Sequence, residues 1–215
     1  MVIDKSKVVD LSHAIRRKGE NFPFHSDYVG NRDKEFWYVM SNIFTGSHVG
    51  THVETPYHHV KDGDDCLTYP LENLIGDAIT LNCSKKPPEE PITLDELLPY
   101  KDMIHEGDII FVWTGCDKFH RTERWMDYRY FTEEAMQWLV SFNPKAIGVD
   151  SFGIEVPGAR SGEPNHMACF NRNIAVIEAL DNLEQIVDER VTAFLLVLPM
   201  EGVDASPVRA IAIRD

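Results

Sequence analysis

The segment from His48 to His59, with the sequence H-V-G-T-H-V-E-T-P-Y-H-H, constrains the fold more than any other part of this chain. Its strongest candidates for metal ligands stand at even positions: His48, His52, Glu54 and His58. Side chains two positions apart on a β-strand point to the same face, so we expect all four on one face. Gly50 and Pro56 oppose a helix, and most residues at the odd positions are β-branched. The segment therefore predicts a strand with a divalent-metal site, whereas a solvated polar strand would more often carry Lys, Glu or Ser.

Length, charge and cysteine content narrow the class of protein. The 215 residues are enough for one sizeable domain, so we expect a single domain over residues 1–215. A net charge of −14, with 21 dispersed Lys and Arg residues, argues against nucleic acid or an anionic membrane as a partner. The sequence shows no signal-peptide pattern and no apolar run of about 18 residues that would span a membrane. Its four cysteines form no C-x-x-C pair, so we expect a reducing, cytoplasmic location.

Short apolar runs bounded by turn residues dominate the rest of the chain. They are strand-length and mostly rich in Val and Ile, which predicts a buried sheet. Three other segments have helical character, and two of them open with a Thr suited to cap a helix. These patterns predict an α/β fold with a mixed β-sheet core and flanking helices. The expected strands are residues 8–11, 78–81, 108–113, 146–149, 174–177 and 194–198, and the expected helices are residues 93–98, 132–140 and 165–170.

The histidine-rich segment is also similar to a family signature. Its pattern H-x-G-T-H-x-[D/E]-x-P-x-H resembles that of the cyclase-like family of metal-dependent hydrolases, which includes bacterial kynurenine formamidases and isatin hydrolases. Further segments resemble family motifs in the same order, so the similarity covers nearly the whole chain. These segments are residues 9–13, 107–115, 166 with 177–183, and 205–210. The resemblance implies the family's swivelling β/β/α arrangement and a homodimer or homotetramer.

The resemblance also implies roles for individual residues. The implied metal ligands are His48, His52, Glu54, His166 and Glu178. Glu54 would bridge two ions. His48 and His52 would also hold one of these ions, and His166 and Glu178 would hold the other. His58 falls at the family's catalytic histidine, and Glu178 would take part in catalysis as well as in metal binding.

The donor types indicate which metals fit. Imidazole and carboxylate ligands without a thiolate suit zinc first and manganese second, with one or two ions per chain. The family usually has Asp where this chain has Glu54, whose extra methylene reaches about one bond further. The loop at residues 151–155 also departs from the T-P-S-x-D pattern of formamidases proper, so formylkynurenine is not assigned as the substrate.

These features predict a metal-dependent amidohydrolase, similar to arylformamidases. Metal-activated water would cleave the C–N bond of a formamide or cyclic amide, and His58 would transfer protons because its ordinary pKa lies near neutrality. The substrate would be a small molecule, and an aromatic one if nearby rings such as Phe22 or Tyr57 line a pocket. Two alternatives stay open: a metal-dependent cyclase or lyase acting on a small carboxylated or hydroxylated substrate, and a non-catalytic metal- or ligand-binding protein on the same scaffold.

Overall fold

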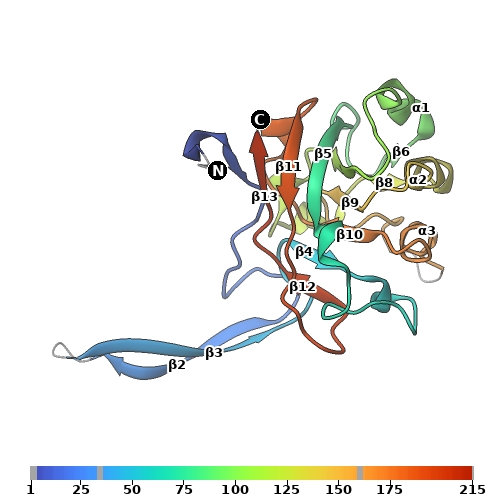
Figure 1. The fold of residues 1–215 in the computed structure, drawn as a ribbon. Helices are drawn as coiled ribbons and strands as arrows, with labels where there is room; N and C mark the ends of the chain where they lie inside the picture. The colour runs from blue at the N-terminus through green and yellow to red at the C-terminus, as the bar shows by residue number, and fades with distance from the viewer. Residues whose placement is uncertain (1–3, 33–35, 159–161, 215) are drawn as a thin grey trace.

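Four of the apolar runs of the sequence form the centre of a nine-stranded mixed sheet that curls into a half-barrel (Figure 1). The computed structural model describes residues 4–32, 36–158 and 162–214. In this part of the chain the sheet and three α-helices make one α/β domain. The predicted fold class, a mixed sheet with flanking helices, is therefore confirmed.

The middle of the sheet is parallel, and its two sides are antiparallel. Strands β5, β7, β9 and β10 run parallel, and the strands beyond them on either side pair antiparallel. Parallel strands need cover on both faces, and every residue of β9 is buried accordingly. In spatial order the strands are β1 (Val8–Asp10), β13 (Ile211–Arg214), β11 (Arg190–Phe194), β5 (Ile75–Asn82), β7 (Ile109–Trp113), β9 (Ala146–Val149), β10 (Ala175–Glu178), β4 (His52–Glu54) and β12 (Ala205–Pro207).

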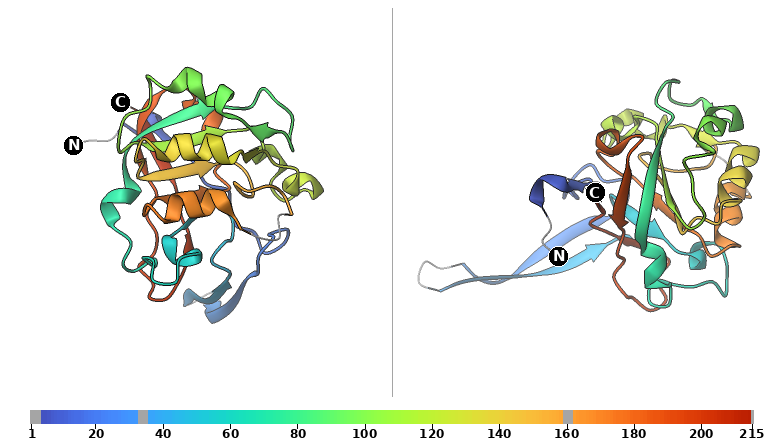
Figure 2. Two further views of the ribbon diagram at one scale, coloured as in Figure 1. Left: turned by 90° about the vertical axis from the view of Figure 1, so that its right-hand side faces the viewer. Right: turned by 45° about the horizontal axis from the view of Figure 1, so that its top comes forward.

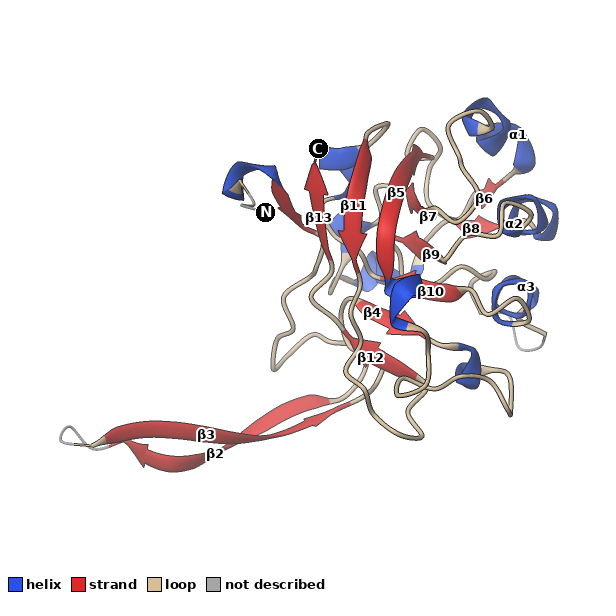
Figure 3. Cartoon of the chain, in the orientation of Figure 1, coloured by secondary structure: helices blue, strands red, loops and turns tan. Residues whose placement is uncertain are grey.

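The three helices stand along one face of the sheet (Figure 3). They are α1 (Leu94–Leu97), α2 (Glu133–Val140) and α3 (Pro164–Phe170), close to the predicted ranges. Thr93 and Glu96 form a capping box at the start of α1, and the Thr132 side chain accepts a hydrogen bond from the Ala135 N–H at 3.2 Å in α2. No helix in the described ranges is long and apolar enough to cross a membrane.

The core lies in two layers, one on each face of the sheet. Because side chains alternate along a strand, Ile110 and Val112 of β7 face the helices, while Ile109 and Phe111 pack on the other face. All four side chains are fully buried. Burial on both faces fixes the register of the central strands, and with it the positions of the side chains at their ends.

Five of the six predicted strands are confirmed, but the sixth lies earlier than expected. The apolar run 194–198 was expected as a strand, whereas β11 ends at Phe194. After this residue the chain leaves the sheet, and Leu196 and Leu198 are 46% and 60% exposed. The run is apolar, but within it only Leu195 is fully buried, so its composition alone misplaced the strand.

Two strand pairs lie outside the main sheet. β6 (Pro91–Ile92) pairs with β8 (Tyr130–Phe131) near the helices. β2 (Phe24–Arg32) pairs with β3 (Trp37–Thr45) in a long hairpin, here called the arm, that projects from the body (Figure 2). The sequence analysis did not predict the arm. Short 3₁₀ helices occupy Lys5–Lys7, Pro56–His58, Leu71–Leu74, Leu98–Tyr100, Asp117–Phe119, Glu123–Met126 and Leu183–Ile186.

Candidate metal centre

The histidine-rich segment 48–59 is not one continuous strand. Only β4 is extended, while His48 lies in the turn before it and His58 ends a 3₁₀ helix. Gly50 has a φ of +62°, and Pro56 opens the 3₁₀ helix, so the backbone leaves the extended conformation on both sides of β4. The predicted strand over all four ligand candidates is therefore wrong. The expected convergence is nevertheless present, because the two turns bring both outer histidines back to the same side.

The pairing of β4 with β10 creates the buried part of the site. Glu178 stands opposite His52 in the antiparallel register, and residues directly opposite each other share a face. His52 Nε2 lies 3.4 Å from Glu54 Oε1 and 3.6 Å from Glu178 Oε2. Helix α3 adds His166, whose Nε2 lies 3.2 Å from Glu54 Oε2 and 3.6 Å from Glu178 Oε1. These four side chains come from three separate elements, and each residue is at most 6% exposed.

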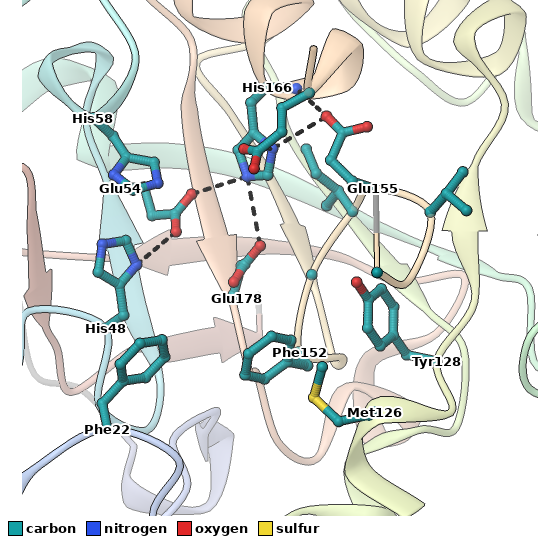
Figure 4. A pocket seen from close by; sticks show the side chains of 15 residues that line it. Phe22, His48, Glu54, His58, Met126, Tyr128, Phe152, Glu155, His166 and Glu178 are labelled. Atoms are coloured by element: carbon teal, nitrogen blue, oxygen red, sulfur yellow. Dashed lines mark hydrogen bonds and ion pairs between the residues drawn. The ribbon is translucent and has the colours of Figure 1, made fainter. Parts of the chain in front are cut away.

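Glu54 and Glu178 each face two histidines, and Figure 4 shows Glu54 between His48 and His166. Glu54 Oε1 lies 2.8 Å from His48 Nδ1, while its Oε2 faces His166. Glu178 likewise places Oε2 toward His52 and Oε1 toward His166. The structure thus brings together all five residues predicted as metal ligands, with Glu54 between His48 and His166.

The donor set fits a divalent cation. Glu54 Oε2 is buried, yet it accepts no hydrogen bond within the described part of the chain. A buried carboxylate oxygen without a hydrogen bond is costly unless a positive charge compensates it. In the described part of the chain, the ligand atoms within each of three triads lie within 4.8 Å of one another: His48, Glu54 and His58; His52, Glu54 and Glu178; and His59, Glu163 and His166. Nitrogen and oxygen donors of these kinds suit zinc or manganese.

Hydrogen bonds orient the two buried imidazole rings. His52 Nδ1 lies 2.8 Å from the Gly50 carbonyl and donates to it, which leaves the Nε2 lone pair directed at the carboxylates. His166 Nδ1 lies 3.2 Å from Glu155 Oε1, which holds its Nε2 inward in the same way. Such outer contacts set the tautomer and direction of a ligating histidine. Both rings are therefore pre-oriented toward one point.

The buried carboxylates and rings strongly shift each other's proton affinities. Burial disfavours the charged ring of His48, but contacts with Asp204 and Glu54 outweigh it and raise the pKa of this histidine to about 10. Burial also disfavours the charged ring of His166, but contacts with Glu155, Glu178 and Glu54 outweigh this effect. They raise the pKa of His166 well above its usual range. Burial and the neighbouring Glu54 raise the pKa of Glu178. The carboxylates thus attract positive charge, which either ring protons or a divalent cation can provide.

Asp204 is a functional candidate that the sequence analysis missed. Its Oδ2 lies 2.9 Å from His48 Nε2 and 2.7 Å from His58 Nδ1, and these two contacts hold the pKa of Asp204 well below its usual range. The backbone carbonyl of Asp204 accepts hydrogen bonds from the Thr55 N–H at 2.9 Å and the Thr55 hydroxyl at 3.0 Å. The sequence could have pointed to Asp204, because this residue directly precedes the family-like segment 205–210.

Two further acidic residues surround His166 and were also missed. Glu155 Oε1 accepts hydrogen bonds from the backbone N–H groups of Asn165 and His166 at 2.7 and 2.9 Å, where α3 begins. Glu163 contacts His59 Nε2 at 2.6 Å. Glu155 belongs to the loop that departs from the formamidase pattern, yet it supplies a carboxylate at the last position of that pattern.

The centre opens into a cavity of about 330 Å³. One end is polar, formed by the histidines and carboxylates described above (Figure 4). The other end is lined by Phe22, Met126, Tyr128 and Phe152. Phe22 and Phe152 are nearly parallel, with ring centroids 6.2 Å apart and an interplanar angle of 4°. Phe22 thus lines the cavity as expected, whereas the 41%-exposed Tyr57 is not among its lining residues.

Sequence comparison defines the family of the chain. The family model named Cyclase matches residues 9–156, and the chain therefore belongs to the Cyclase family. A kynurenine formamidase of Maricaulis maris is 24% identical over 211 residues, which cover 96% of this chain and 97% of the relative. A kynurenine formamidase of Bordetella avium is 27% identical over 220 residues, which cover 94% of this chain and 95% of the relative.

Solved structures share the fold. Isatin hydrolase A from Ralstonia solanacearum superposes with a TM-score of 0.87 at 21% identity, over 97% of this chain and 92% of that one. An isatin hydrolase bound to the product analogue thioisatinate gives a TM-score of 0.84 at 21% identity, over 96% and 92% of the two chains. A structure described as a potential metal-dependent hydrolase with cyclase activity gives a TM-score of 0.77 at 25% identity, over 97% of this chain and 98% of that one.

Proposed function

We propose that this protein is a metal-dependent hydrolase that opens the C–N amide bond of a small aromatic formamide or cyclic amide. The observation that carries the proposal is the buried cluster of histidines and carboxylates at the polar end of an aromatic-lined cavity. Relatives named kynurenine formamidase and isatin hydrolase support the same class of reaction. We also propose a cytoplasmic location, which suits the four buried free cysteines.

The proposed ligands surround Glu54. His48 and His52 face its Oε1 atom and His166 faces its Oε2 atom, while Glu178 lies 3.6 Å from both His52 and His166. One or two divalent ions fit this arrangement, with zinc preferred over manganese. A bound ion supplies a Lewis acid that activates water and polarises the amide carbonyl.

His58 is the proposed proton-transfer group. Its Nδ1 is held by Asp204, so its Nε2 is left for exchange of a proton with the reacting groups. The side chain is 27% exposed, more than the ligands at the bottom of the site, and it lines the cavity. A histidine in this position can take a proton from the attacking water and deliver it to the departing nitrogen.

The aromatic end of the cavity indicates the substrate class. Phe22 and Phe152 face one another across a ring-to-ring distance of 6.2 Å, and the Tyr128 ring lies 6.0 Å from Phe152. Aromatic walls favour flat apolar groups, and the polar end then receives the amide. A small aromatic amide matches both ends of a cavity of about 330 Å³.

The proposal is tested by metal content and turnover in one experiment. Elemental mass spectrometry should find one to two zinc or manganese ions per chain in the wild type and none in a His48→Ala/His52→Ala variant. Isatin and N-formylkynurenine are suitable first substrates, and reaction in heavy-oxygen water should place one solvent oxygen in the product. His58→Ala should keep its metal but lose about a hundredfold in rate.

The matched control is His105→Ala, since His105 is exposed and lies outside the cavity. It should behave as wild type. Absence of stoichiometric metal after reconstitution, or full activity in His58→Ala, would contradict the proposal. Turnover without incorporation of solvent oxygen would instead indicate the cyclase or lyase alternative, and stable metal binding without any turnover would indicate a binding protein.

A further inference from the structure

Tyr128 is a buried residue of the cavity wall whose hydroxyl has no partner. The residue is 5% exposed and lines the cavity beside the candidate metal centre. Its hydroxyl forms no hydrogen bond with any residue that the structure describes. Most buried polar groups are paired, because an unpaired one costs free energy. The hydroxyl is therefore available to a molecule that enters the cavity.

The backbone holds Tyr128 firmly in this position. The Glu89 N–H donates to the Tyr128 carbonyl at 3.2 Å. The next residue, Arg129, is 1% exposed, and its guanidinium donates to the Glu90 and Pro91 carbonyls at 3.1 and 2.7 Å. A group that is already fixed loses little freedom when it binds a ligand. The wall that carries the hydroxyl is thus preorganised.

The hydroxyl stands where the aromatic and polar ends of the cavity meet. The Tyr128 ring lies 6.0 Å from the Phe152 ring, and Figure 4 shows its hydroxyl turned toward the polar end. A Cβ added to Gly153 would lie 3.2 Å from the hydroxyl oxygen, so the glycine leaves this oxygen uncovered. Burial and the nearby charge of Glu178 raise the pKa of Tyr128 above its usual range. The hydroxyl therefore keeps its proton and can donate a hydrogen bond.

We propose that Tyr128 selects the substrate by donating a hydrogen bond to a second carbonyl, ortho to the amide on the aromatic ring. The proposal rests on the proposed function, in which the amide carbonyl itself is polarised at the metal centre. An ortho carbonyl lies at the junction of ring and amide, which corresponds to the junction of the two ends of the cavity. Among the described lining residues only Tyr128 has a hydroxyl, and ionised carboxylates accept hydrogen bonds without donating any.

The test compares two aryl formamides that differ by an ortho acetyl group. This group gives 2-acetylformanilide an ortho ketone, which formanilide lacks. The wild type should prefer the ketone about tenfold in kcat/KM, and Tyr128→Phe should lose about tenfold on the ketone, mainly through KM, but less than about twofold on formanilide. Tyr130→Phe is the matched control, because Tyr130 lies on β8 and is not among the lining residues. It should match the wild type on both formamides.

Thermal unfolding separates recognition from a structural role. In the free protein the hydroxyl has no partner to lose, so Tyr128→Phe should unfold at the wild-type temperature or above it. A lower unfolding temperature would assign the hydroxyl to the fold and overturn the proposal. Equal losses on the two formamides, or no loss on the ketone, would overturn it as well.

Binding without turnover keeps this proposal distinct from the proposed function. Isothermal titration calorimetry is performed with 2-aminoacetophenone and aniline, the amine products of the two formamides. The wild type should bind the ketone about tenfold more tightly, and Tyr128→Phe should bind both amines alike. If the wild type hydrolyses neither formamide but shows this difference, the proposed function fails and ketone recognition by Tyr128 remains. If it hydrolyses both without preferring the ketone, the role of Tyr128 fails and the proposed function remains.

Discussion

In most soluble proteins charged side chains are exposed and apolar side chains are buried. The metal centre and the arm each depart from this rule, the first by burying charged groups and the second by exposing apolar ones. The centre buries charged and ionisable groups, with His52, Glu54 and Glu178 at most 6% exposed. The arm exposes large apolar groups, with Trp37 at 66% and Ile43 at 65%. Each arrangement costs free energy in an isolated chain, and each is relieved by a different partner. A bound cation would compensate the first, and an apolar surface would cover the second.

The two regions also differ in how they are held. The centre is fixed by strands and a helix that belong to the core, and its rings are oriented by hydrogen bonds. The arm is fixed by its own ladder and, at its root, by the hydrogen bond from the Gly46 N–H to the Pro23 carbonyl. Substitutions in the centre should therefore first change the proposed chemistry, whereas substitutions in the arm should leave the packing of the core in place.

Removing the bridging charge should have the largest effect. Glu54→Gln keeps the shape of the side chain but removes a negative charge that faces His48 and His166. We expect metal affinity to fall more than a hundredfold, which exceeds the loss that is usual when a residue that only orients a metal ligand is changed. Activity should fall with the affinity. Competition with a chelator measures the affinity. Glu72→Gln, at an exposed glutamate, is the control, and wild-type affinity in Glu54→Gln would refute the assignment.

Changing Asp204 should have an intermediate effect. Asp204→Asn weakens the contacts of 2.9 Å to His48 and 2.7 Å to His58 without removing a proposed ligand. We expect a ten- to hundredfold loss in metal affinity or in kcat, as is typical for groups that orient ligands. Chelator competition and steady-state kinetics separate the two losses. The control is Asp62→Asn, at an exposed position, and equal behaviour of both variants would remove Asp204 from the site.

A smaller effect should appear in the pH dependence of stability. The rings of His13 and His120 stack with centroids 3.9 Å apart behind the centre. Burial, helped by Arg121, lowers the pKa of His13 to about 4, and burial, helped by His13 and Arg121, lowers that of His120 to about 3. Asp181 and Glu20 face the pair at 3.4 and 3.8 Å. The folded protein therefore keeps both rings neutral at a pH where the unfolded chain protonates them.

The sign follows from proton binding. Below about pH 6.5 the unfolded state takes up more protons than the folded state, so stability should fall as the pH drops from 6.5 toward 4. The slope should be up to about 1.4 kcal/mol per pH unit for each histidine. Urea unfolding between pH 7 and pH 4 measures it. A His13→Asn/His120→Asn variant should show a shallower slope than wild type, while His105→Ala should not; equal slopes in all three would exclude the pair as the cause.

Much of the fold was predictable because local patterns and burial agree. β9 occupies the predicted residues 146–149, since this run is apolar and buried on both faces. Helix α2 begins after Thr132, where a capping side chain and apolar spacing coincide. The run 194–198 failed, because it is apolar but partly exposed. The arm was missed because β3 does not alternate between apolar and polar residues, and its apolar side chains are exposed rather than buried.

Residue types and their spacing were enough to show which side chains can bind a metal, and they placed two of these side chains on one face of β4. Their types and the two-residue spacing are local properties, so no distant contact was needed. Only the tertiary structure decided that Asp204, 146 positions from His58, completes the site, and that β10 and α3 bring Glu178 and His166 to it. Such contacts depend on how strands pair and pack across the whole chain, and strand pairing is not encoded by the local pattern of either strand.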